Sequence, residues 1–357
     1  CKILHDPTCP PTHQFLATYH YYERIWGADA VVHTGTHGSM EWTPGKGIGL
    51  TESSYPDICI GSTPHLYIYN SDNPSEGLVA KRRSLATLVD HMQHLMVGVN
   101  LYGPFAELDS LLDEYSSARG DLVRSENLRT AILEKAREAR FDDIGMDPET
   151  SLEECVRLCH EELSKMRNSQ MNRGLHILGR MPRGEDRVDA VFSIVRYGEE
   201  HNSLRDCIAD IMGLDLSELY RSQGTIDEMT GRSNGELIED VDRLTRDFVS
   251  GILADDAVGD VLSGLELDAT AEQIESFGPF VDTIRDIDRR MDDSKEIEAL
   301  MNGLSGGRID PGPSGYITRG RYDILPTGRN FYSMDPNTVP THTAWAVGQT
   351  LASETYR

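Results

Sequence analysis

Short apolar runs alternate with longer amphipathic stretches over the first hundred residues, and this pattern predicts an α/β arrangement. Residues 15–26 are rich in aromatic side chains and predict a buried helix, which Gly27 ends. Residues 30–32 form an apolar run that predicts a buried strand. Residues 58–60 and 66–69 predict two further strands.

A long amphipathic helix is expected over residues 77–96, because their apolar side chains fall on one helical face. That face comprises Leu78, Leu85, Leu88, Val89, Met92, Leu95 and Met96. Tyr102-Gly-Pro104 breaks the pattern shortly after it.

Residues 111–300 predict a mostly helical region. Ser151-Leu-Glu-Glu154 and Thr270-Ala-Glu-Gln273 match the capping box that begins many helices, and an apolar period follows each of them. Acidic side chains are dense between residues 240 and 298, where we expect them on solvated helix faces.

Residues 301–357 change character. Six glycines fall between residues 303 and 320, among prolines, arginines and tyrosines. A flexible linker is one interpretation. An ordered loop that lines a site is favoured, because a bare linker would hold fewer aromatic residues. A return helix is expected after it.

These patterns predict an α/β fold: an α/β core around a His-rich loop, with a large mostly helical region inserted or appended. The expected parts are residues 1–110, 111–300 and 301–357. The chain opens at Cys1 without a methionine and closes at Arg357 inside the expected return helix. We therefore expect a piece of a longer polypeptide, truncated at both ends.

The charge of the chain limits the partners that it can have. Its 357 residues include 34 basic and 59 acidic side chains, a net charge of −25. This excess disfavours general affinity for nucleic acid or anionic lipid. No apolar run approaches the ~18 residues that span a bilayer, and we expect no secretory leader. The six cysteines lack zinc-ribbon spacing and are expected to be reduced thiols in a cytoplasmic protein.

The strongest candidate for chemistry is His33-Thr-Gly-Thr-His37-Gly-Ser-Met-Glu41, which follows the expected strand of residues 30–32. Ligands bind at the carboxyl ends of strands in open α/β sheets. His33, His37 and Glu41 would share a helical face, or a glycine-rich turn would fold them together. Either geometry offers two nitrogens and an oxygen to a divalent cation, and proton acceptors near neutral pH. The alternative is a pair of histidines that are merely hydrogen-bonded in a loop.

Two further stretches carry positive charge. Glu76-Gly-Leu-Val-Ala-Lys81-Arg82-Arg83 is a dense basic cluster, and it predicts either an anion site or a solvated helix face. Thr327-Gly-Arg329-Asn330 would recognise a carboxylate or carbonyl, or only stabilise its own turn. No P-loop occurs, so a reaction that needs ATP would draw it from another subunit.

Residues 28–46, Ala-Asp-Ala-Val-Val-His-Thr-Gly-Thr-His-Gly-Ser-Met-Glu-Trp-Thr-Pro-Gly-Lys, resemble the signature shared by the cobaltochelatase large subunit and the magnesium chelatase H subunit. Further blocks follow in that family's order: Glu76 to Arg83, Leu101-Tyr-Gly-Pro104, Gly174-Leu-His176, Pro311-Gly-Pro-Ser-Gly315 and Leu325-Pro-Thr-Gly-Arg-Asn-Phe-Tyr332. The resemblance runs from about Asp6 to the last residue. Thr43 departs from it, where an apolar residue is expected before Pro44. Family large subunits are much longer, so the chain resembles an interior piece.

The resemblance implies the tetrapyrrole-binding subunit of an ATP-dependent metal chelatase, a ligase that forms nitrogen–metal bonds. Partner subunits of the ATPase type would use the ATP, and this chain would be inactive without them. One branch of the family inserts cobalt into a corrin precursor, hydrogenobyrinic acid a,c-diamide, in cobalamin biosynthesis. The other inserts magnesium into protoporphyrin IX. Imidazole ligands suit Co²⁺ better than Mg²⁺, so cobalt is favoured.

The resemblance also implies roles for residues. His33, His37 and Glu41 would bind the metal and accept the protons that the macrocycle loses. The expected substrate-binding residues are Glu76, Lys81, Arg82, Arg83, Thr327, Arg329, Asn330 and Tyr332. Residues 303–332 are expected to pack against the His33–Glu41 loop, with Tyr316, Phe331 and Tyr332 as walls. The alternatives are a tetrapyrrole- or metal-binding module without insertion activity, and a metal-dependent hydrolase.

Overall fold

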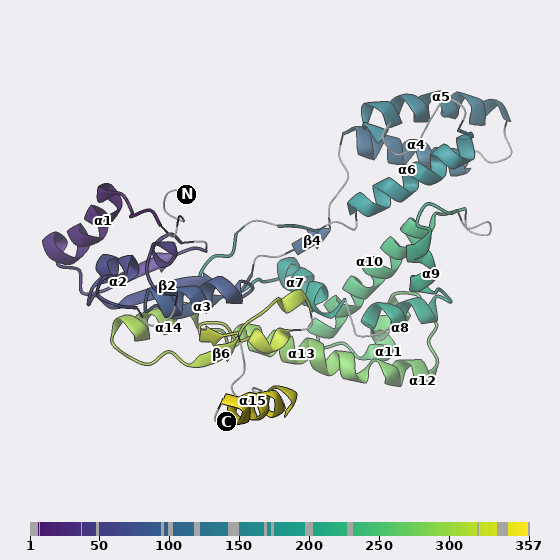
Figure 1. Ribbon diagram of the computed structural model, residues 1–357. Helices are drawn as coiled ribbons and strands as arrows, with labels where there is room; N and C mark the ends of the chain where they lie inside the picture. The colour runs from purple at the N-terminus through teal and green to yellow at the C-terminus, as the bar shows by residue number, and fades with distance from the viewer. Residues whose placement is uncertain are drawn as a thin grey trace. The chain divides into compact units, whose positions relative to one another are not determined.

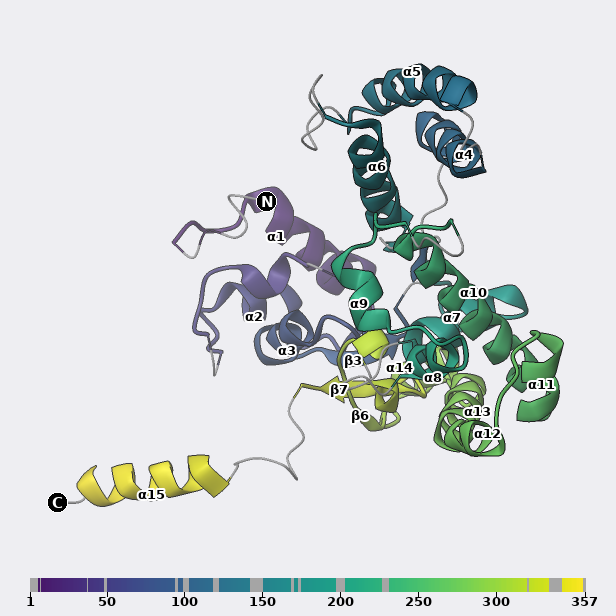
Figure 2. The ribbon, with the colours of Figure 1, turned by 90° about the vertical axis from the view of Figure 1, so that its right-hand side faces the viewer.

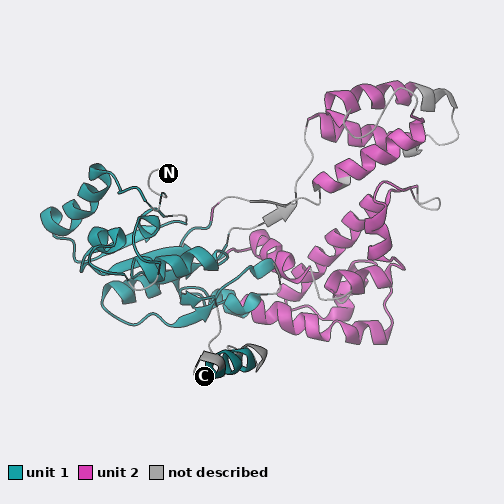
Figure 3. Cartoon of the chain, viewed as in Figure 1, with its two compact units in different colours: residues 1–93, 176–181, 289–357 teal, residues 94–175, 182–288 magenta. Residues whose placement is uncertain are grey.

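The computed structural model describes residues 6, 8–36, 38–47, 50–93, 96–98, 103–117, 122–141, 150–167, 170–172, 175–196, 203–226, 231–319, 321–333 and 342–355 (Figure 1). The chain divides into two compact units (Figure 3). Unit 1 comprises residues 1–93, 176–181 and 289–357, and unit 2 comprises residues 94–175 and 182–288. The α/β fold is confirmed, and the mostly helical unit 2 is inserted into unit 1 in two stretches. Residues 303–333 thus belong to the same unit as the first ninety residues.

Unit 1 is built on a parallel sheet of three strands in the order β1 (Val31–Thr34), β2 (His65–Asn70) and β3 (Thr87–His91). All six residues of the central strand β2 are buried. Parallel sheets need cover on both faces, and successive side chains of a strand point to opposite faces. The strands expected at residues 30–32 and 66–69 are therefore confirmed.

One face of the sheet packs on α3 (Pro74–Arg83), where Tyr67 and Tyr69 of β2 meet Ala80. The opposite face carries Leu66 and Val89, which pack with residues of α14 (Glu296–Leu304). The two helices lie on either side of the strands in Figure 2. The alternation along β2 thus gives one face to aromatic residues and the other to aliphatic ones.

The prediction of one long helix over residues 77–96 is wrong. Helix α3 ends at Arg83, Leu85 takes a left-handed conformation with φ of 53°, and the chain then enters β3. Leu88 and Val89 are fully buried on opposite faces of the sheet. A short apolar run that is buried on both sides has no period of its own, so it is easily read as part of a helix.

Two more expectations near the N-terminus need correction. Residues 58–60 lie in helix α2 (Tyr55–Ile60), not in a strand; Pro56 stands in its first turn, a place that suits proline. The helix expected over residues 15–26 exists as α1 (His13–His20) followed by a π-helical stretch, η1 (Tyr21–Trp26). Gly27 ends it with φ of 71°. It is not a buried helix, since Trp26 is 70% exposed.

The Gly/Pro-rich part is ordered, as the sequence predicts. It contains β6 (Pro311–Pro313) and β7 (Asn330–Tyr332), which pair in parallel, and the 3₁₀ turns η4 (Ile317–Arg319) and η5 (Tyr322–Ile324). Helix α15 (His342–Thr355) lies where the sequence predicts a helix near the end of the chain.

Unit 2 is mostly helical in its described residues, which also include a small antiparallel pair, β4 (Met96–Gly98) and β5 (Gln170–Asn172). Its helices are α4 (Pro104–Ser117), α5 (Leu122–Glu138), α6 (Leu152–Arg167), α7 (Glu185–Val195), α8 (Leu204–Ile211), α9 (Leu216–Arg221), α10 (Asn234–Leu253), α11 (Val258–Gly264), α12 (Ala271–Ser276) and α13 (Gly278–Asp292), which ends in unit 1. The capping box at Thr270 is confirmed. Across the described ranges, no helix is both long and apolar enough to cross a membrane.

Asp90 of β3 fastens the turn before β7 to the sheet. Its Oδ1 accepts hydrogen bonds from the backbone N–H groups of Gly328 (2.8 Å) and Arg329 (2.7 Å). Its backbone N–H donates to the carbonyl of Arg329 at 2.9 Å. The side chain is completely buried, and this burial raises the pKa of Asp90 to about 7.

We expect Asp90 to give the protein a distinctive dependence of stability on pH. In the folded state the carboxyl binds its proton up to about pH 7, whereas in the unfolded chain it loses the proton near 3.8. The folded state therefore binds more protons between these values, and stability falls as the pH rises through them. Asp90→Asn keeps an acceptor for both N–H groups but cannot ionise.

The measurement is urea unfolding of both proteins between pH 4 and pH 8. The variant should gain stability relative to the parent as the pH rises from about 4 to about 7, and the difference should be constant above that. A difference that does not change with pH would contradict the assignment.

Candidate functional site

The described candidate residues all lie in unit 1, in three groups. His33 lies within strand β1, whereas the sequence pattern places it directly after the strand. Glu41 follows in the 3₁₀ turn η2 (Met40–Trp42). The basic cluster is on α3, and the third group leads into β7. His37 lies outside the described residues.

His33 contacts three aromatic side chains. Its Nε2 is 3.2 Å from the hydroxyl of Tyr19, and its Nδ1 is 2.7 Å from Nε2 of His65. The ring of Tyr67 lies 5.3 Å from the His33 ring, centre to centre. Burial, with a smaller contribution from His65, lowers the pKa of His33 to about 4. The imidazole is therefore neutral near pH 7 and keeps a lone pair.

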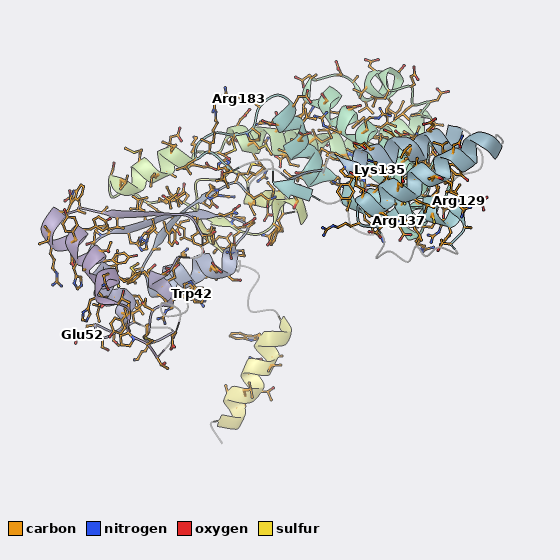
Figure 4. All side chains as sticks on the ribbon, turned by 90° about the horizontal axis from the view of Figure 1, so that it is seen from above. Trp42, Glu52, Arg129, Lys135, Arg137 and Arg183 are labelled. Atoms are coloured by element: carbon orange, nitrogen blue, oxygen red, sulfur yellow. The ribbon has the colours of Figure 1, made fainter. Side chains whose placement is uncertain are left out.

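Glu41 is a buried carboxyl group that lacks a full set of hydrogen bonds. The residue is 1% exposed, and its Oε1 has no hydrogen-bond partner. Burial raises the pKa of Glu41, and the nearby Glu76 raises it further. The next residue, Trp42, is 37% exposed and lies at the surface of unit 1 (Figure 4). A buried carboxyl with a raised pKa is suited to accept a proton near neutral pH.

Gly38 makes this arrangement possible. A Cβ at this position would lie 2.4 Å from the hydroxyl of Tyr67 and 2.6 Å from Oε1 of Glu41. Tyr67 and Glu41 therefore converge on one small space from strand β2 and turn η2. Burial raises the pKa of the Tyr67 hydroxyl, and the negative charge of Glu41 raises it further.

Arg83 holds the loop that follows Glu41. Its Nε donates to the carbonyl of Glu41 at 2.6 Å, and its Nη2 donates to the carbonyl of Thr43 at 2.6 Å. Its Nη1 donates to the carbonyls of Gly45 (3.3 Å) and Lys46. The planar guanidinium thus fixes the backbone of residues 41–46 instead of presenting a free fork to an anion.

The other residues of the basic cluster differ in their exposure. Lys81 donates from Nζ to the carbonyl of Phe331 at 2.9 Å, and burial lowers the pKa of its ammonium. Glu76 accepts a hydrogen bond from the hydroxyl of Tyr69 at 3.2 Å. Arg82, by contrast, is exposed. Its side chain is accessible to a molecule that approaches α3.

The third group, Thr327, Arg329 and Asn330, forms hydrogen bonds with other residues of unit 1. The hydroxyl of Thr327 donates to Oε1 of Glu296 at 2.7 Å, and Arg329 donates from Nη2 to the carbonyl of Ile324 at 2.5 Å. Oδ1 of Asn330 accepts from the backbone N–H of Leu88 at 3.2 Å. These side chains build the turn, which is the alternative that the sequence left open.

Residues 328–332 pack on α3 and β3. Phe331 is fully buried and contacts Tyr69, Ala80 and Leu88, so its expected role as a substrate wall is wrong. Tyr332 is half-buried, and its carbonyl accepts a hydrogen bond from Ser314 at 2.7 Å. Whether residues 303–332 also cover the loop from His33 to Glu41 stays a prediction.

The sequence did not reveal a buried hub at Glu296. This carboxylate accepts hydrogen bonds from Met92 N–H (3.0 Å), Thr327 Oγ1 (2.7 Å), Gly179 N–H (2.6 Å) and His176 Nε2 (2.7 Å). The ring of His176 stacks on that of His91, 5.3 Å between centres and 3° from parallel. His176 belongs to the family block Gly174-Leu-His176, so the sequence did point to one of the residues around Glu296.

No metal centre is evident in the part of the chain that the structure describes: it contains no group of three His, Cys, Asp or Glu side chains placed to hold a cation. The three-residue site of His33, His37 and Glu41 includes a residue beyond that part. It therefore stays a prediction.

Adding a methyl group at Gly38 tests the packing between Tyr67 and Glu41. Both neighbours are buried and have little room to retreat, so we expect Gly38→Ala to cost about 1–3 kcal/mol of unfolding free energy. Gly47→Ala is the matched control, because a Cβ there meets nothing within 4 Å. Urea unfolding measures both variants, and equal midpoints would show that the Gly38 contact does not constrain the site.

Comparison with known proteins gives a consistent result. The CobN/Magnesium Chelatase family profile matches residues 1–357. An uncharacterised protein of Methanocaldococcus jannaschii is 41% identical over 99% of the chain. The aerobic cobaltochelatase subunit CobN of Pseudomonas aeruginosa is 33% identical over 97% of the chain, and the magnesium-chelatase H subunit of Chlorobaculum parvum is 30% identical over 98%.

A solved structure agrees with this. The catalytic subunit of cobaltochelatase from Mycobacterium tuberculosis is 33% identical and matches 98% of the chain with a TM-score of 0.74. The chain spans 29% of that protein and 28% of the length of each of the three relatives.

Proposed function

Because the chain belongs to the CobN/magnesium chelatase family, we propose that it forms the tetrapyrrole-binding region in which a chelatase large subunit inserts its metal. The observation that carries this proposal is the Glu41 carboxyl, buried, without a partner for Oε1 and next to the tyrosine–histidine group of the sheet.

Metal insertion has a clear proton requirement. A free-base macrocycle carries two inner N–H protons, and both must leave as the divalent cation takes their place. Glu41 accepts one of them, because burial raises the proton affinity of its carboxylate. The neutral imidazole of His33 accepts the other. The surrounding protein excludes water, which lowers the competition for the incoming cation.

Cobalt is the first choice of substrate metal and magnesium the second. Imidazole and carboxylate together suit Co²⁺, whereas Mg²⁺ prefers an all-oxygen set. The macrocycle would accordingly be a corrin precursor, with protoporphyrin IX as the alternative. The similar relatives include subunits named for each metal, so competition between Co²⁺ and Mg²⁺ in the insertion assay decides the matter.

Arg82 is the residue of α3 that we assign to the acidic side chains of the tetrapyrrole, since it is exposed. Lys81, Arg83 and Arg329 act indirectly, because their donors hold backbone carbonyls of the site. ATP is used by partner subunits of the ATPase type. The alternative function is a tetrapyrrole- or metal-binding module without insertion activity, and the presence of both His33 and Glu41 favours the enzyme.

Glu41→Gln separates insertion from binding. The amide has nearly the same volume but cannot accept the proton, so we expect insertion to slow by at least about 100-fold. The affinity for the tetrapyrrole, measured by fluorescence quenching, should change by no more than about twofold. Insertion is followed by absorbance with the full-length large subunit and its partner subunits.

The matched control is Glu52→Gln, which removes an exposed carboxylate (Figure 4). It should leave both rate and affinity unchanged. Full insertion activity of Glu41→Gln would refute the role of Glu41, and a parallel loss of binding would favour the simple binding module.

A further inference from the structure

Tyr19, His33 and His65 form a continuous row of hydrogen bonds that ends on a backbone carbonyl. The Tyr19 hydroxyl is 3.2 Å from Nε2 of His33, and Nδ1 of His33 is 2.7 Å from Nε2 of His65. Nδ1 of His65 is 2.9 Å from the carbonyl oxygen of Ser84. Helix α1, strands β1 and β2 and the residue after α3 each supply one member.

The carbonyl at the end of the row sets the direction of every bond. The Ser84 oxygen can only accept, so Nδ1 of His65 carries a hydrogen. In a neutral His65 the lone pair is then on Nε2, and this lone pair accepts from Nδ1–H of His33. The lone pair of His33 is consequently on Nε2, where it accepts from the hydroxyl of Tyr19.

The opposite tautomer of His33 is excluded by the same contacts. With hydrogen on Nε2, the Nδ1 lone pair of His33 would face the lone pair of His65 across 2.7 Å. His65 has little freedom to turn away, because it is 5% exposed and tied to Ser84. The burial of His65 also favours its neutral form, in which one ring nitrogen keeps a lone pair.

We propose that His65 is a positioning residue, which holds His33 as the Nδ1–H tautomer so that its Nε2 takes a proton relayed through Tyr19. This inference rests on the function proposed above and assigns residues to its proton path. As the Tyr19 O–H bond breaks, an N–H bond forms at His33, and the Tyr19 oxygen takes a proton from a pyrrole nitrogen of the macrocycle. The electron pair of that N–H bond stays on the nitrogen, where it binds the metal.

The proton that arrives at His33 creates an imidazolium next to His65. Its Nδ1–H continues to donate to the His65 lone pair, so no bond of the row needs to reverse. The arrangement keeps the His33 ring oriented without removing its proton, as a group oriented behind a general base does in other sites. His65 acts through His33 in this scheme and is not placed against the substrate.

The test compares two replacements of His65 in the full-length large subunit with its partner subunits. His65→Phe keeps a flat ring but removes the acceptor; we expect kcat for insertion to fall by at least about 10-fold with the KM for tetrapyrrole within about twofold. His65→Gln restores an acceptor oxygen near the position of Nε2 and should recover most of that loss. His13→Phe, at an exposed histidine of α1, is the matched control and should change neither value.

A second readout reports the tautomer without any activity. Imidazole ¹⁵N spectra of histidine-labelled protein, with the His33 signals identified by their loss in His33→Gln, should show hydrogen on Nδ1 and not on Nε2. In His65→Phe the Nε2–H tautomer should become populated.

Hydrogen on Nε2 of His33 in the parent protein would overturn the inference. So would a tautomer change in His65→Phe without a change in kcat, or equal losses in His65→Phe and His65→Gln. If the parent protein inserts no metal with any partner set, the proposed function fails, and the ¹⁵N spectra still decide the orientation of the row.

Discussion

The guanidinium of Arg83 is the contact on which the arrangement of the candidate site depends most. It joins the end of α3 to the carbonyls of Glu41, Thr43, Gly45 and Lys46. Hydrogen bonds from a charged donor contribute roughly 1.5–3 kcal/mol each, and a buried carboxyl without full hydrogen bonding costs a comparable amount. Without these hydrogen bonds, a loop with two glycines would be too flexible to hold the Glu41 side chain away from water. The hydrogen bonds of Arg83 therefore offset part of the free-energy cost of burying Glu41.

Three buried carboxyl groups of unit 1 differ in how the protein satisfies them. Although burial opposes it, hydrogen bonds from His176, Gly179 and Thr327 hold the pKa of Glu296 below its usual value. Asp90 receives two backbone donors on one oxygen, and burial raises its pKa to about 7. Glu41 keeps an oxygen without a partner. Asp90 likewise keeps an oxygen, Oδ2, without a partner, while its other oxygen joins the turn before β7 to the sheet. An oxygen without a partner is therefore not peculiar to Glu41, and what distinguishes Glu41 as a candidate for chemistry is its place beside Tyr67 and Gly38.

The sequence predicted the parts of the fold that have a clear pattern. Strands β1 and β2 follow from their apolar runs, and His33 and Glu41 from their spacing around glycine. Strand β3 was missed, because its apolar residues continue the face of α3 without a break. Tyr19, His65 and Glu296 were also missed, since each meets its partner through the fold and not through the chain: His33 and His65 are neighbours in space but 32 residues apart. Pairing of β1 with β2 brings them together, and no local pattern records that pairing.

The parallel sheet also explains why the two proposed proton acceptors, His33 and Glu41, both lie near Tyr67. His33, His65 and Tyr67 contact one another on the face that packs on α3, and burial there acts on every ionisable group. The same burial raises the pKa of Glu41 and lowers that of His33, so it moves the proton affinities of a carboxylate and an imidazole toward each other. His33 then holds a proton only weakly near neutral pH, and Glu41 holds one more strongly than an exposed carboxylate does. The proposed function, in which the site takes two protons from one macrocycle and releases both before the next, suits acceptors whose proton affinities are similar. The acidity of the departing protons comes from the metal that replaces them, which allows the acceptors to remain weak.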